Sequence, residues 1–119
     1  MADASALVEY LLGMPQAAAI ASVLEDSDTD VHVPALCDVE IAAALRKGLL
    51  SRRMSLGRAA AAVEDYLDLP LVRHGHGRLI AAILEKRANF SAYDAAYVAL
   101  AEILSAALLT RSASTSGSP

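Results

Sequence analysis

Short apolar runs that alternate with helical segments constrain the fold of this chain more than any other feature. Such runs stand at Val31–Val33, Leu69–Val72 and Ala106–Thr110, with a strand stub at Met1–Ala2. Because helices separate the runs, the strands are expected to pair in parallel through crossover connections. In sheets of this kind, ligands collect at the carboxyl ends of the strands. The sequence therefore predicts an α/β domain whose functional residues follow its strands.

Helical periodicity accounts for most of the remaining chain. The expected helices are one capped by Ser5 and stopped by Gly13, then Pro15–Leu24, the residues that follow Pro34 up to Gly48, Leu56–Leu67, Arg78–Arg87, and a last one from a Ser91 cap to about Ser105. A chain of 119 residues is long enough to bury one core. We expect a single domain over residues 1–111, followed by a disordered tail of Ser, Thr, Gly and Pro at 112–119.

The composition and the net charge of the chain limit the classes of function that we expect for it. The net charge of −4 gives no electrostatic argument for nucleic-acid binding by the chain as a whole, although a local basic strip can still act over a Debye length of about 8–10 Å. Cys37 is the only cysteine, so an intramolecular disulfide is excluded and a reducing cytoplasm is expected. The chain shows neither a signal peptide nor an apolar run of the roughly 20 residues that a transmembrane helix needs, so no membrane association is expected.

Three carboxylates stand beside the expected strand-to-helix transitions. Asp3 precedes the first helix, Glu40 lies early in the helix after Val31–Val33, and Asp94 lies in the first turn of the last helix. Glu40 shares a helical row with Leu36 and Ala44, which places it on a largely apolar strip, whereas Asp38 points to another face. Carboxylates that converge repel one another unless a cation neutralises them. Their hard oxygen atoms suit Mg²⁺ or Mn²⁺.

Each of these acids also has a structural alternative. Ser91 and Asp94 match a capping box, with Asp in place of the usual Glu. Asp3 can be a helix-start charge that interacts favourably with the helix dipole. Glu40 can pair with Lys47 or with another cation. The mutual distances of the three acids decide between a metal site and three separate caps.

Other charged or metal-type segments have plain structural interpretations. The acidic residues 25–30 are typical of a solvated loop, and they lack the glycine and the distal glutamate of an EF-hand. The two histidines of residues 74–77 have no cysteine or carboxylate at ligand spacing, which favours a loop over a zinc site. The cations at 46, 47, 52, 53 and 58 indicate a solvated helix–turn with cations at a helix end, or else a patch for RNA phosphates.

Several segments, taken in order, resemble a PIN domain of the VapC toxin family over nearly the whole chain. The most specific is Ser91–Glu102, which reads Ser-Ala-Tyr-Asp-Ala-Ala-Tyr-Val-Ala-Leu-Ala-Glu. The others are residues 3–6 (Asp-Ala-Ser-Ala), 33–40 (Val-Pro-Ala-Leu-Cys-Asp-Val-Glu), 69–71 (Leu-Pro-Leu) and 108–110 (Leu-Leu-Thr). The resemblance implies a helix-rich, three-layer α/β/α PIN-like domain with a short, mostly parallel central sheet. It also implies a metal-dependent endoribonuclease toxin.

The resemblance further implies roles for single residues and partners. Asp3, Glu40 and Asp94 match the family's catalytic, metal-binding acids, and Mg²⁺ or Mn²⁺ is the implied cofactor. Ser5 and Thr110 match hydroxyl residues beside that site. The implied partners are a cognate VapB-like antitoxin, an RNA substrate and a second copy of the chain in a homodimer. Ser112 stands where the family carries a fourth acid, which leaves open a weakened or inactive PIN-like module that still binds antitoxin or RNA.

Overall fold

The computed structural model describes residues 4–13, 25 and 30–116, with the backbone alone described from residue 106 onward. The chain forms two compact units, Met1–His74 and Gly75–Pro119, and each is described by itself. The expected helix Pro15–Leu24 and most of the acidic segment 25–30 lie outside the described residues. None of the described helices is both long and apolar enough to cross a lipid bilayer.

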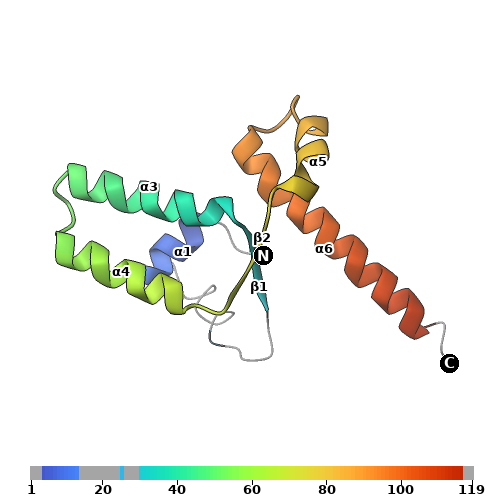
Figure 1. The fold of residues 1–119 in the computed structure, drawn as a ribbon, viewed down its shortest axis with the longest axis horizontal. Coiled ribbons are helices and arrows are strands. Elements are labelled where there is room, and N and C mark those ends of the chain that lie inside the picture. The colour runs from blue at the N-terminus through green and yellow to red at the C-terminus, as the bar shows by residue number, and fades with distance from the viewer. Residues whose placement is uncertain (1–3, 14–24, 26–29, 117–119) are drawn as a thin grey trace. The chain divides into compact units, whose positions relative to one another are not determined.

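The first unit is built on two parallel strands joined by a helical hairpin (Figure 1). Its elements in chain order are α1 (Ala4–Leu11), β1 (Val31–Pro34), α3 (Leu36–Leu50), α4 (Leu56–Asp68) and β2 (Leu71–His74). β1 and β2 pair from Val31 opposite Leu71 to Pro34 opposite His74, so their carboxyl ends lie at the same edge. The predicted α/β fold class, rich in helices and with a short parallel sheet, is confirmed.

The position of β2 differs slightly from the prediction. The strand occupies Leu71–His74 instead of Leu69–Val72. Proline has no backbone N–H to donate to a neighbouring strand, so Pro70 lies before the strand and pairing starts at Leu71. His74 therefore belongs to β2, where its Nε2 lies 2.9 Å from Nδ1 of His32 on β1. The loop predicted for residues 74–77 begins after His74, and His76 directly precedes a short 3₁₀ helix, η2 (Gly77–Leu79).

Apolar faces of the helices enclose the core of the first unit. α3 buries Cys37, Ile41 and Leu45 at intervals of four residues, which is the period of one helix face. α1 buries Leu7 and Leu11 and packs against both α3 and α4. The predicted helices are confirmed here with small changes: α3 ends at Leu50 instead of Gly48, and α1 begins at Ala4. Ser5 consequently lies inside α1, and its prediction as the N-cap is wrong.

A polar network joins α3, α4 and β2 at the edge of this core. The Tyr66 hydroxyl donates to Oδ1 of Asp38 at 2.5 Å, and Nε of Arg73 donates to the same carboxylate at 2.9 and 3.1 Å. The guanidinium of Arg73 also lies 5.3 Å from the centre of the Tyr66 ring. Burial raises the pKa of Asp38, but the hydrogen bonds from Tyr66 and Arg73 and the charge of Arg73 outweigh it, so the pKa is lowered overall. Burial and the bond to Asp38 raise the pKa of Tyr66.

The second unit consists of η2, α5 (Ile80–Glu85) and the long helix α6 (Ala92–Ser116). Leu79, Ala99 and Leu100 are fully buried, and Ile83 and Leu104 pack against them. Lys86, at the end of α5, forms a 2.8 Å salt bridge with Glu102 of α6. The expected helix at Arg78–Arg87 is thus divided between η2 and α5.

The prediction of a strand at Ala106–Thr110 is wrong, because these residues continue α6 as a helix. Alanine and leucine have the strongest intrinsic preference for helix, and the segment follows without a break from a helix already formed. A short apolar run does not by itself distinguish a buried strand from a buried helix. The domain bounds at 1–111 and the disordered tail at 112–119 stay predictions.

The network around Asp38 predicts a pH-dependent loss of stability. Tyr66→Phe removes one hydrogen bond to a charged group and should lower the free energy of unfolding by about 1 kcal/mol, a modest value because the Asp38 side chain is 45% exposed. Since the pKa of Asp38 lies below its ordinary 3.8 in the folded chain, this contribution is complete above that pH and is lost as the pH falls further. Urea unfolding at several pH values measures it. Tyr93→Phe, at an exposed position, is the matched control, and an equal effect of both variants would contradict the prediction.

Candidate functional site

Glu40 lines a groove between α1 and α3. The groove has a volume of about 380 Å³ and is lined by Ala4, Ser5, Val8, Glu9, Glu40 and Ala44. Glu40 and Ala44 lie one turn apart on α3 and are half-buried, as expected for the strip on which the sequence places them. The structure thus brings Ser5 and Glu40, two of the predicted site residues, to the same groove.

The neighbouring acid Asp38 has a different role. It holds Tyr66 and Arg73 at the edge of the sheet, whereas Glu40 faces α1. This separation confirms that the two acids of the α3 start do not share a pocket. The groove is lined by two carboxylates, Glu40 and Glu9, and by the hydroxyl of Ser5, and Glu9 was not among the predicted site residues. These hard oxygen ligands fit Mg²⁺ or Mn²⁺.

Asp94 lies in the first turn of α6, in the second unit, and is exposed. Its backbone N–H donates to Oγ of Ser91 at 3.1 Å, so Ser91 caps the helix as predicted. In a full capping box the acid would return a bond to the backbone N–H of Ser91. Among the residues that the structure describes, the Asp94 carboxylate makes no such bond. The capping alternative therefore accounts for Ser91 but leaves the carboxylate of Asp94 without a capping role.

The remaining predicted residues are described less fully. Asp3 lies outside the described residues, and the backbones of Thr110 and Ser112 belong to α6. No group of three or more His, Cys, Asp and Glu side chains within the described part of the chain could hold a metal ion. Because Asp3 is not part of that set, the proposed site of Asp3, Glu40 and Asp94 stays a prediction.

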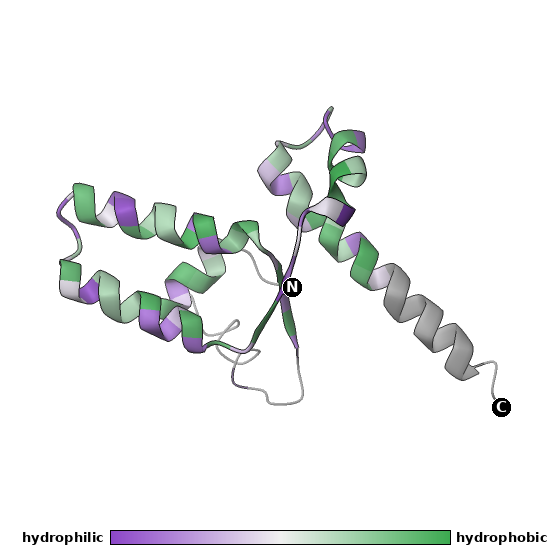
Figure 2. Ribbon diagram, viewed as in Figure 1, coloured by the Kyte–Doolittle hydropathy of each residue, from purple (hydrophilic) through white to green (hydrophobic). Residues whose placement is uncertain are grey.

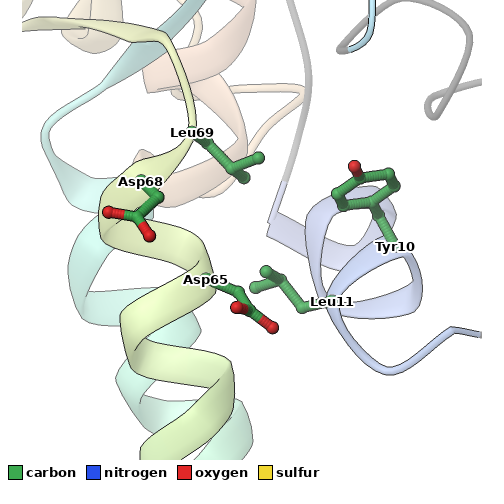
Figure 3. Close-up of a pocket in the computed structure, with 5 residues that line it drawn as sticks. All are labelled: Tyr10, Leu11, Asp65, Asp68 and Leu69. Carbon is green, nitrogen blue, oxygen red and sulfur yellow. The ribbon is translucent and has the colours of Figure 1, made fainter.

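A second hollow, of about 430 Å³, lies between α1 and the end of α4 (Figure 3). Its lining includes Tyr10, Leu11 and two acids that were not among the predicted site residues, Asp65 and Asp68. Figure 3 shows Asp65 extending toward Leu11 and Asp68 extending away from it. The two carboxylates therefore do not converge on one point, and the groove with Glu40 is the better candidate site.

Comparison with known proteins identifies relatives over most of the chain. A family model for the PIN domain matches residues 1–112. Ribonuclease VapC9 of Mycobacterium tuberculosis is 43% identical over 110 residues, which cover 91% of this chain and 81% of the relative. Ribonuclease VapC12 of the same organism is 36% identical over 108 residues, which cover 91% and 82%. Ribonuclease VapC1 is 36% identical over 119 residues, which cover 98% and 88%.

The geometry at the start of α6 predicts that the cap and the acid can be separated by mutation. Ser91→Ala should lower the free energy of unfolding by about 1 kcal/mol, because it removes the acceptor of the Asp94 N–H. Asp94→Asn should cost only about 0.5 kcal/mol, the loss of a favourable charge at a helix start. Urea unfolding of both variants measures the difference. A larger loss for Asp94→Asn than for Ser91→Ala would show that the carboxylate has a structural role after all.

Proposed function

This chain belongs to the VapC family of PIN-domain proteins, and we propose that it is a metal-dependent endoribonuclease, the toxin of a toxin–antitoxin pair. The observation that carries the proposal is the 43% identity to a protein named Ribonuclease VapC9, over 91% of this chain. The match to the PIN-domain family model over residues 1–112 includes all the predicted acids. The half-buried Glu40 in the α1–α3 groove adds a local acid with the donor chemistry that such an enzyme needs.

In this proposal Asp3, Glu40 and Asp94 bind Mg²⁺ or Mn²⁺ through their carboxylate oxygens. When bound, a cation of this kind supplies Lewis acidity to a water and to the scissile phosphate. Ser5 belongs to the wall that faces Glu40, where its hydroxyl is available to hydrogen-bond and orient a carboxylate or a phosphate oxygen. We assign Thr110 the same kind of supporting role on the strength of its match to the family motif.

The proposal includes partners and a location. A cognate VapB-like antitoxin would inhibit the toxin, RNA would be the substrate, and the chain would form a homodimer. The names of the relatives support the antitoxin and the RNA, because VapC names the toxin of such a pair. We also propose a cytoplasmic location, which the presence of a single cysteine, the buried Cys37, supports because it excludes an intramolecular disulfide.

The alternative is a PIN-like module that has lost activity because Ser112 replaces the fourth acid. The relatives that match this chain are named ribonucleases, which favours the active enzyme. An incomplete set of acids is expected to weaken metal binding rather than to change the fold, because the three other acids are present in the sequence. The proposed enzyme therefore retains activity with a weakened metal site.

Removing one proposed metal-binding acid should abolish most of the activity. Glu40→Gln and Asp94→Asn are each expected to slow RNA cleavage by about a hundredfold or more, since each removes a charged oxygen donor at the reacting phosphate. The measurement is cleavage of a labelled RNA by the antitoxin-free chain with Mg²⁺ or Mn²⁺. Mn²⁺ binding should weaken in the same two variants.

Glu64→Gln is the matched control, because Glu64 is exposed on α4 and lines neither hollow described above. It should cleave RNA at the rate of the unmodified chain. Circular dichroism should show the same helix content in all three variants. The proposed function fails if the unmodified chain and its Ser112→Asp form both cut no RNA with either metal.

Ser112→Asp should strengthen the metal site. A charge about 4 Å from a bound cation contributes about 4 kcal/mol at an effective dielectric constant of about 20, before desolvation offsets part of it. Mn²⁺ affinity is therefore expected to rise about tenfold or more, with faster RNA cleavage at limiting metal. Isothermal titration with Mn²⁺ checks this, and Ser114→Asp is a control with the same change of charge. Equal gains in both variants would indicate a general charge effect and contradict the assignment of position 112.

A further inference from the structure

The cations of the first unit are concentrated at the turn between α3 and α4. Five of the ten lysines and arginines of the chain lie there, namely Arg46, Lys47, Arg52, Arg53 and Arg58. None of the fourteen acids lies between Glu40 and Glu64. In Figure 2 the turn between the two helices is strongly hydrophilic, whereas much of α3 and α4 is apolar. A chain with a net charge of −4 therefore carries a strongly positive tip on this hairpin.

These cations are exposed, and ion pairs do not neutralise them. Salt bridges join Arg73 to Asp38 and Lys86 to Glu102, whereas none of the five cations forms one with another described residue. The Arg58 guanidinium donates to the backbone oxygen of Leu11 at 3.2 Å, which leaves its charge uncompensated. The helix dipole acts on cations within the last turn, which in α3 contains Lys47, so stabilisation of α3 alone does not account for five.

The turn holds its cations in a defined position. Ser51 and Arg53 donate backbone hydrogen bonds to Lys47 and Gly48 at 3.0 and 3.1 Å, and Arg52 adopts a left-handed φ of 61°. The Met54 side chain packs against Gly48, where an added Cβ would lie 3.3 Å from it. The chain therefore folds back on the end of α3 and brings Arg53 beside Lys47.

A second groove leads from this tip toward Glu40. It has a volume of about 590 Å³ and is lined by Val8, Ala44, Lys47, Gly48, Ser51 and Arg53. Val8 and Ala44 also line the groove that contains Glu40 and Ser5, so the two hollows share a wall. Glu40, Ala44 and Lys47 follow one another along one face of α3, and the helical rise from Glu40 to Lys47 is about 10 Å. One continuous surface between α1 and α3 thus has the candidate acid at one end and two cations at the other.

We propose that Lys47 and Arg53 bind phosphates of an RNA strand that runs along the α1–α3 groove to Glu40, an assignment that rests on the proposed ribonuclease function. The cations hold the backbone a short distance from the phosphate to be cut, and the apolar wall of Val8 and Ala44 accommodates bases. Arg46, Arg52 and Arg58 add to the positive field that attracts the strand. Phosphate contacts position a nucleic acid without reading its sequence, so this surface fixes register and not specificity.

RNA binding in the absence of divalent metal tests the proposal without requiring cleavage. The measurement is the fluorescence anisotropy of a short labelled single-stranded RNA in EDTA, with the full chain and at several salt concentrations. Lys47→Gln and Arg53→Gln should each weaken binding roughly two- to fivefold. Each should also reduce the slope of log affinity against log salt by about 0.7. Lys47→Arg keeps the charge and should bind RNA as the unmodified chain does.

Arg87→Gln is the charge-matched control, because Arg87 is exposed and its guanidinium donates only to the nearby backbone oxygen of Leu84. It should change neither the affinity nor the salt slope by as much as the groove variants do. Equal losses in all three Gln variants would overturn the proposal, and so would an unmodified chain that binds no RNA. If the groove variants lose polyglutamate binding as strongly as RNA binding, the groove is a site for an acidic polypeptide and the RNA assignment is wrong.

Failure of this proposal can be distinguished from failure of the proposed function. A chain that cuts RNA, but whose Lys47 and Arg53 variants bind and cut it unchanged, retains its ribonuclease function and loses the groove assignment. A chain that cuts no RNA, but binds it through Lys47 and Arg53, retains the groove assignment and loses the ribonuclease function.

Discussion

The parallel pairing of β1 with β2 is the constraint on which the first unit depends. Two parallel strands cannot be joined by a tight turn. The chain must first run back to the opposite end of the sheet, where the second strand begins. The α3–α4 hairpin makes this return, and its first helix begins directly after the carboxyl end of β1. Glu40 lies in the second turn of that helix because the crossover starts there. The candidate site is thus a consequence of the direction in which the strands run.

Two acids that are only two residues apart show how a helix separates structural from functional roles. Asp38 is directed to β2 and α4, where Tyr66 and Arg73 donate to it, and the three groups hold the hairpin to the sheet. Glu40 instead lines the groove between α1 and α3. The hydrogen bonds and the charge that lower the pKa of Asp38 help it to keep its own charge as the pH falls, so that it continues to stabilise the fold.

The charge distribution along α3 indicates how the proposed RNA substrate would run along this helix. Cations placed next to a cluster of acids would compete with a metal ion for the carboxylates. In this chain the candidate acid and the cations stand at opposite ends of one helix face, with small and apolar residues between them. An anionic strand could therefore be attracted at one end and cut at the other. The membership of the VapC family supplies the reaction, and the groove supplies a route for the substrate.

The sequence by itself determined the local features of this protein. Periodicity located α3 and α4, the Ser91 hydroxyl marked the start of α6, and the absence of acids between Glu40 and Glu64 revealed the basic segment. Alternating strands and helices gave the parallel sheet, and the motif around Asp94 gave the family. The helices, the cap and the basic segment depend on residues close together in the chain, so a short stretch of sequence carries their signal. The parallel pairing follows instead from the order of strands and helices along the chain.

Only the tertiary structure determined which residues from distant parts of the chain lie next to one another. The groove between α1 and α3, the return of Arg53 over the end of α3, and the bonds of Asp38 to Tyr66 and Arg73 join residues that no sequence spacing relates. The same limit explains the wrong strand at Ala106–Thr110, since a short apolar run fits a buried strand and a buried helix equally well. The burial of a side chain and the position of its partners depend on the packing of the whole chain. They follow from the free energy of the whole fold and not from any local stretch of sequence.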